Sequence, residues 1–110
     1  MSTNRPNIAV YEKIGDSFNQ IFTVASDERV DAGKESTPIT VYVGNITKHE
    51  LVDLSIFADD KDLVITPSRI ASLMPSEKKP ITLIWKPKIT RETGLLAKIS
   101  GIATKVVKPR

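Results

Sequence analysis

Residues that could carry chemistry are few in this chain of 110 residues, and they do not gather in the sequence. His49 is the only histidine and stands beside Glu50. Metal sites and acid–base pairs need several such groups that converge on one point. No cysteine is present, which excludes disulfides, thiolate metal sites and thiol chemistry. We therefore expect His49 to be a solvated loop residue.

A short acidic segment is the second candidate. Asp59, Asp60 and Asp62 lie close together, and carboxylate oxygens suit a hard cation such as calcium. Their spacing differs from that of an EF-hand loop, and no glycine supplies its tight turn. We expect an acidic hairpin tip without a bound metal.

Catalytic motifs are not found. The serines and threonines include no G-x-S-x-G elbow, and the five glycines form no phosphate-binding loop. The sequence therefore predicts a protein that is not an enzyme, with no catalytic residue, cofactor or metal ligand.

Charge is distributed unevenly along the chain. Residues 1–62 contain 6 Lys and Arg against 11 Asp and Glu, a balance of −5, whereas residues 63–110 contain 10 against 2, a balance of +8. Such a split allows head-to-tail attraction between copies, contact with phosphates, or simply solvated outer faces. The partner-binding candidates are the cations Lys78, Lys79, Lys86, Lys88 and Arg91.

Alternation of apolar and polar residues predicts strands almost throughout. The predicted core consists of the apolar residues on one face of three such strands: Ile39, Val41, Val43, Val52, Leu54, Ile56, Ile81, Leu83 and Trp85. Trp85 shares its parity with Ile81 and Leu83, so we expect it to lie in the core and not to stack on a ligand.

Prolines separate the predicted strands, because proline lacks the N–H that a central strand donates. Residues 8–14 and 95–107 are predicted as edge strands, the latter kinked at Gly101. Residues 18–24 are predicted as a further strand, and residues 70–74 as a single helical turn. The predicted fold is all-β, an immunoglobulin-like antiparallel β-sandwich of about seven strands. A polar N-terminal arm, residues 1–7, precedes a single domain, residues 8–108.

Four segments resemble a known family. These are Asp31-Ala32-Gly33 with residues 39–45, residues 52–57, the run Leu63–Pro67 with Leu73-Met74-Pro75 and residues 81–87, and residues 94–107. Together they are similar to the immunoglobulin-like sandwiches of the major sperm protein and abnormal-spindle/Hydin group. Ser76-Glu77 departs from the pattern, which has a glycine there. The resemblance covers residues 30–108 and implies an interaction role, since members of that group bind partners or polymerise.

The leading hypothesis is a non-catalytic structural or assembly protein, such as a decoration or accessory protein of a virus particle. One alternative is a free-standing module that binds a protein partner at a strand edge. The other is a nucleic-acid binder with a basic surface, although the basic part contains only one aromatic residue, Trp85. No signal peptide or membrane span is evident, so we expect a cytoplasmic location or incorporation in a virion.

Overall fold

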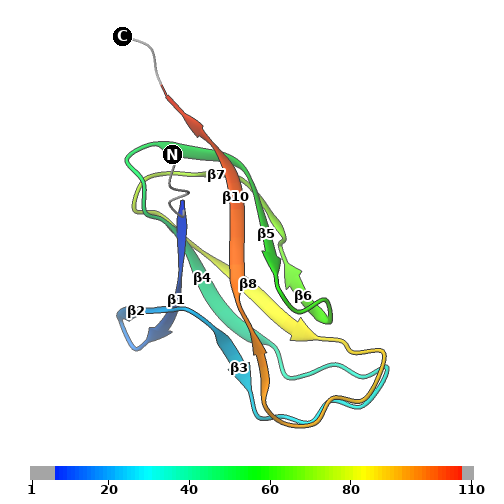
Figure 1. The fold of residues 1–110 in the computed structure, drawn as a ribbon. Helices are drawn as coiled ribbons and strands as arrows, with labels where there is room; N and C mark the ends of the chain where they lie inside the picture. The colour runs from blue at the N-terminus through cyan, green and yellow to red at the C-terminus, as the bar shows by residue number, and fades with distance from the viewer. Residues whose placement is uncertain (1–6, 108–110) are drawn as a thin grey trace, which may run out of the picture.

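Antiparallel strands and short turns make up residues 7–107, the part of the chain that this computed structural model describes (Figure 1). The predicted N-terminal arm lies outside these residues, except for Asn7. Ten strands are present within residues 7–107, and every strand pair is antiparallel. The all-β antiparallel sandwich is therefore confirmed, with more and shorter strands than expected.

The larger sheet has the order β2-β1-β4-β8-β6. A hairpin of β1 (Ile8–Ile14) and β2 (Ser17–Ile21) forms one end, followed by β4 (Ile39–Asn45), β8 (Lys78–Trp85) and β6 (Leu63–Thr66). The prediction of β1 as an edge strand is wrong, because β1 pairs with both β2 and β4. Gly15, with φ +60°, supplies the left-handed turn of the hairpin.

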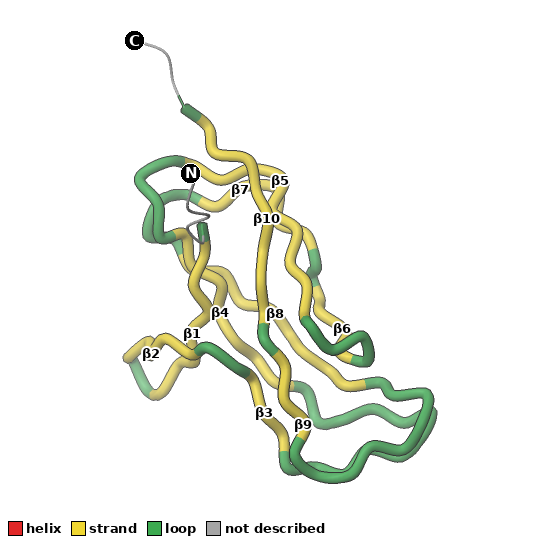
Figure 2. The backbone as a smooth tube through the Cα atoms, in the orientation of Figure 1, coloured by secondary structure: helices red, strands yellow, loops and turns green. Residues whose placement is uncertain are grey.

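The smaller sheet has the order β10-β5-β7 and packs against the larger one (Figures 1 and 2). Its strands are β10 (Ile99–Val106), β5 (Glu50–Ala58) and β7 (Arg69–Leu73). A two-stranded ribbon of β3 (Val24–Ser26) and β9 (Leu95–Ala97) continues beyond β10. The expected helical turn at residues 70–74 is wrong, since β7 occupies that place and pairs with β5.

The core lies between the two sheets. Seven of the nine predicted core residues are buried: Val41, Val43, Leu54, Ile56, Ile81, Leu83 and Trp85. Ile39 is half-buried and packs against the core from its margin. Val52 is also only half-buried, and Leu51 takes its place in the core.

A bulge in β5 explains the exchange of Val52 for Leu51. The pairing register with β10 shifts between Ile102 and Thr104, so that Asp53 is an extra residue on β5. Asp53 has φ +53°, a left-handed conformation that breaks the alternation of faces. Residues on the two sides of Asp53 therefore follow different parities, and Leu51 points inward together with Leu54.

Pro80 lies inside β8 and does not end a strand, as its residue type had suggested. The last residue pair between β8 and β6 joins Thr82 to Thr66, so β8 has no β6 neighbour at Pro80. A proline is tolerated there because its missing N–H removes no bond to β6.

Candidate functional site

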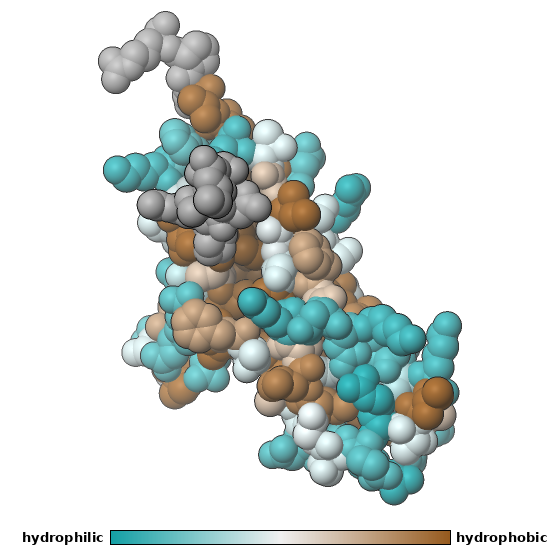
Figure 3. Space-filling view, viewed as in Figure 1, coloured by the Kyte–Doolittle hydropathy of each residue, from teal (hydrophilic) through white to brown (hydrophobic). Residues whose placement is uncertain are grey.

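A groove lies between β1 and β10, which belong to different sheets and do not pair with each other. Its volume is about 640 Å³. Three segments line it, residues 7–10, 20–22 and 98–102, and their apolar side chains include Ile8, Val10, Ile21, Phe22 and Ile99. Figure 3 shows hydrophobic surface between these elements, bordered by hydrophilic side chains. The groove is open enough for a ligand to enter.

The wall formed by β10 is an open strand edge. β10 pairs with β5 on one side, and within residues 7–107 no strand pairs with it on the other. At Lys98 the C=O accepts a bond from the Asp59 N–H at 3.2 Å, and the N–H donates to Asp59 Oδ1 at 2.8 Å, so both groups face the β5 side.

Backbone groups alternate between the two edges of a strand. From Lys98 onward, the N–H and C=O groups that face the open edge are therefore those of Ile99, Gly101, Ala103 and Lys105. They remain available to a partner.

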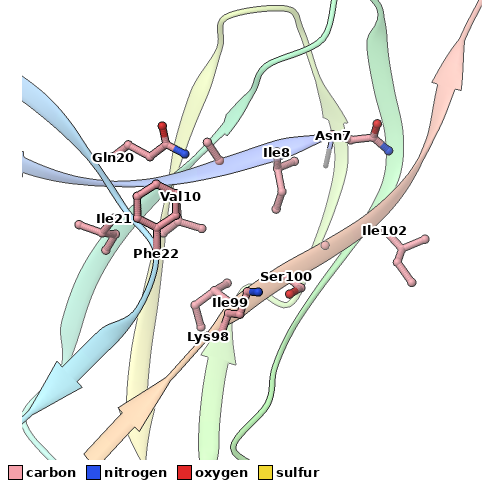
Figure 4. A pocket seen from close by; sticks show the side chains of 12 residues that line it. Asn7, Ile8, Val10, Gln20, Ile21, Phe22, Lys98, Ile99, Ser100 and Ile102 are labelled. Atoms are coloured by element: carbon pink, nitrogen blue, oxygen red, sulfur yellow. The ribbon is translucent and has the colours of Figure 1, made fainter. Parts of the chain in front are cut away.

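Ile8 closes the groove at the end near Asn7. Its side chain points from β1 toward β10 in Figure 4. A Cβ atom at Gly101 would lie 2.6 Å from Ile8 Cδ1, closer than atoms pack. Gly101 therefore permits the close approach of β1 and β10, and it does not kink the strand as the sequence had suggested: Gly101 pairs in regular register with Ile56.

The chain itself covers the lower part of the same edge. β3 pairs with β9 so that Val24 lies opposite Ala97, and Val24 is buried. In Figure 2, β3 lies on the groove side of β9 and β10, whereas β5 lies on the other side. The chain turns away at Phe22, which is 76% exposed at the border of the groove. Above that turn the edge has no covering strand among the described residues.

The cations predicted as partner contacts fall into two groups at the two ends of β8. Lys78 and Lys79 lie at its beginning, and Lys86, Lys88 and Arg91 follow its end. Eight residues of strand separate these groups by about 23 Å. The five cations therefore do not form one compact patch.

Most of these cations already have partners in the folded chain. Lys78 Nζ lies 5.0 Å from the Tyr11 ring centroid and 5.3 Å from that of Phe18. Lys79 Nζ donates to the Ser72 carbonyl at 2.7 Å, and Lys86 Nζ lies 3.3 Å from Glu35 Oε2. Exposed ion pairs such as Lys86–Glu35 contribute little to stability, but they lower the charge presented to a ligand.

Arg91 joins the acidic segment to the core, which neither the partner prediction nor the hairpin-tip prediction anticipated. Its Nη1 lies 3.0 Å from Asp60 Oδ2 and 2.9 Å from Asp62 Oδ2. Burial alone would raise the pKa of Asp60, but hydrogen bonds from Asp62, Trp85 and Arg91, with the charge of Arg91, lower it below the usual value. The bonds to Asp62 and Asp60 raise the pKa of Arg91. Arg91, Asp60 and Asp62 therefore bind one another within the folded chain.

His49 lies in the loop between β4 and β5 and is exposed. Its backbone carbonyl accepts bonds from the side chains of Asn45 and Thr47 at 2.8 and 2.9 Å. Asn45 is buried and also donates to the Leu73 carbonyl at 2.8 Å. Within residues 7–107, no three His, Cys, Asp or Glu side chains gather in a way that could hold a metal ion.

The residues of the groove were not selected from the sequence. Phe22 was assigned to one continuous strand with Phe18 and Val24, and Lys98 was only one of many cations in the basic part. The single useful signal was the prediction of residues 95–107 as an edge strand, together with Gly101 inside it.

The fold and the groove define an all-β antiparallel sandwich in which the open edge of β10 lies beside an apolar groove. No protein-family model, no curated protein and no solved structure matches this chain. The resemblance to the major sperm protein and abnormal-spindle/Hydin group stays a prediction. No helix within residues 7–107 is long and apolar enough to cross a membrane.

Proposed function

We propose that this protein is a non-catalytic association domain that accepts an extended segment of a partner protein at the outer edge of β10. The observation that carries the proposal is the open edge beside an apolar groove. Peptides that add a strand to a sheet gain affinity from main-chain hydrogen bonds and specificity from pockets for alternate side chains. The open edge of β10 offers the main-chain hydrogen bonds, and the groove offers the space for side chains.

The strand order supports the proposal. In immunoglobulin-like sandwiches one sheet has the order A-B-E-D and the other contains C, F and G. The run β1-β4-β8-β6 follows the first order, and β5 and β10 take the places of C and F. Within the described residues no strand stands in the place of G. An added segment would complete the second sheet.

An exposed edge would otherwise be a liability. Unpaired backbone groups on a long edge promote aggregation, and proteins commonly protect them with charges, prolines or covering segments. β10 contains no proline, and its eight residues include one charged residue, Lys105. A partner strand that protects this edge is consistent with an assembly role, and incorporation in a virus particle or a cytoplasmic complex stays a prediction.

Selection of peptides tests the proposal. Nine-residue peptides selected from a random display library on the immobilised protein should alternate apolar and polar residues. In the ¹⁵N-labelled protein they should shift the amide resonances of β10. Phe22→Asp should abolish binding, because it puts a charge at the border of the groove.

Phe57→Asp is the matched control. Phe57 is also exposed, but it lies on β5 opposite Ser100 and does not line the groove. Both variants should keep the wild-type thermal transition, since exposed substitutions change stability little. Selected peptides that bind another surface, or that bind Phe22→Asp as well as wild type, would reject the proposal.

A further inference from the structure

We infer that the segment accepted at β10 runs antiparallel to it, belongs to a different protein, and carries acidic residues that pair with Lys98 and Lys105. This inference rests on the proposed function and specifies the chemistry of the partner. Four observations carry it: the register of β3, the side chains under the open edge, the two lysines, and the repulsion between these lysines when two copies pair.

The direction follows from β3. β3 already covers the lower part of the edge in antiparallel pairing, with Val24 opposite Ala97. A segment that continues this line upward meets the free N–H and C=O groups of Ile99, Gly101, Ala103 and Lys105 in the same register. Such a segment runs in the same direction as β3. Antiparallel pairing is also slightly more stable per residue than parallel pairing.

The side chains under the edge set the pattern of the segment. Residues directly opposite each other in an antiparallel pair point to the same face. Ile99 is buried, and the space beside it is lined by Val10 and Phe22, so the residue opposite Ile99 should be apolar. The residue opposite Gly101 should be small, because Ile8 Cδ1 already fills the space above that glycine.

Two lysines mark the ends of the vacant edge. Lys98 precedes β10 and Lys105 lies near its end, about 23 Å away along an extended strand. Both are exposed, and neither forms an ion pair with another residue in the range 7–107. Acidic residues opposite them should strengthen binding, since opposite charges in cross-strand pairs are stabilising.

A second copy of this chain does not match that chemistry. Full-length antiparallel pairing of β10 with another β10 brings Lys98 of one copy next to Lys105 of the other, and like charges opposite each other are unfavourable. Residues 1–6 and 108–110 carry Arg5, Lys108 and Arg110 and no acidic residue, so these two segments do not supply the acidic groups either. A segment of another protein is therefore the better occupant.

Read from its N-terminus, the segment begins with an acidic residue opposite Lys105. An apolar residue then lies opposite Ala103, a small residue opposite Gly101 and an apolar residue opposite Ile99. The next and last residue is acidic and lies opposite Lys98. The probe is the eight-residue peptide Asp-Thr-Val-Thr-Ala-Thr-Val-Asp with blocked ends. The comparison peptide has lysine in place of both aspartates. Each is titrated into the ¹⁵N-labelled full chain at low salt, and amide hydrogen exchange is followed.

The acidic peptide should protect the amides of Ile99, Gly101, Ala103 and Lys105. The amides of Ser100, Ile102 and Thr104 face β5 and should be protected already in the free protein. The lysine peptide should bind about tenfold more weakly, which corresponds to the loss of two cross-strand ion pairs and the gain of two repulsions. The double variant Lys98→Glu, Lys105→Glu should reverse this preference.

The control is the double variant Lys34→Glu, Lys48→Glu, which changes net charge equally at exposed residues that do not line the groove. This control should keep the preference for the acidic peptide. If it loses that preference as fully as the Lys98, Lys105 variant, Lys98 and Lys105 are not the residues that contact the acidic side chains. Equal binding of both peptides, with protection of the four edge amides, would overturn the acidic partner but keep strand acceptance. Protection by neither peptide would overturn both.

Light scattering tests whether a second copy of this chain, and not another protein, covers the edge. A concentration-dependent dimer in which the four edge amides are protected without peptide would show that a second copy covers the edge, and the inference of a different protein would fall. A monomer with rapidly exchanging edge amides is the result expected.

Discussion

Trp85 Nε1 donates a hydrogen bond to Asp60 Oδ2 at 3.1 Å, and this bond connects the centre of the core to the acidic segment that follows β5. Trp85 has no exposed surface, and the side chain of Asp60 is only 10% exposed. Arg91 contacts the same carboxylate from the loop after β8. A buried tryptophan needs a partner for its N–H, and here the partner is a carboxylate that is itself neutralised.

The first prediction concerns the volume of Trp85. Trp85→Ala should lower the free energy of unfolding by about 3–5 kcal/mol, because it leaves a cavity at a fully buried site. Trp85→Phe should cost less, since most of the volume remains and only the bond to Asp60 is lost. Urea denaturation followed by circular dichroism measures both. A Trp85→Ala variant with wild-type stability would show that Trp85 does not support the core.

The second prediction concerns the pH dependence of stability. The pKa of Asp60 in the folded chain lies below its ordinary value, so the unfolded chain binds more protons as the pH falls. The resulting stabilisation is complete above the unfolded pKa of about 3.9 and is lost as the pH falls through the folded pKa. Asp60→Asn should therefore lose less stability than wild type between about pH 5 and pH 2.

Asp16→Asn is the control for that experiment. Asp16 is exposed in the turn between β1 and β2 and forms no ion pair with another described residue. Its stability profile against pH should follow that of wild type. If Asp60→Asn follows the same profile, the Asp60 carboxylate is not held by the bonds from Trp85 and Arg91.

The core could be predicted from the sequence wherever a strand keeps its regular alternation. Val41 and Val43 on β4 and Leu83 and Trp85 on β8 are buried as their spacing indicated, because neither strand is interrupted. The rule failed in β5, where Asp53 adopts φ +53° without a glycine to signal it. A bulge at a residue of ordinary type depends on the neighbouring strands, and local spacing does not reveal it.

The groove could not be predicted for a different reason. It forms where β1 meets β10, and Ile8 and Gly101, which close it, are separated by most of the chain. Alternation indicates which residues face inward, but it does not say which strands are neighbours or where a sheet ends. Phe22 illustrates the point: its spacing with Phe18 and Val24 predicted one strand, whereas the chain turns away there between β2 and β3.

The third prediction concerns the bulge at Asp53. Asp53→Val should lower the free energy of unfolding by about 1–2 kcal/mol, because a β-branched residue is strained in the left-handed region. Asp53→Gly should retain wild-type stability or exceed it slightly. Thr104→Val is the control, since Thr104 is exposed on the neighbouring strand β10 and has no positive φ. Equal stability of Asp53→Val and Thr104→Val would contradict the strained bulge.

The fourth prediction concerns the contact that closes the groove. Gly101→Ala places a Cβ 2.6 Å from Ile8 Cδ1 and 3.1 Å from Leu54 Cδ1, so Ile8 must move away from β10. The expected cost is about 1–3 kcal/mol. Ile8→Val removes the Cδ1 atom and should cost about 0.5–1.5 kcal/mol on its own. The double variant should lose less unfolding free energy than the sum of the two single losses, because the shortened side chain makes room for the new methyl group. Thermal denaturation of the four proteins measures this coupling, and strictly additive losses would mean that Ile8 does not limit the approach of β1 to β10.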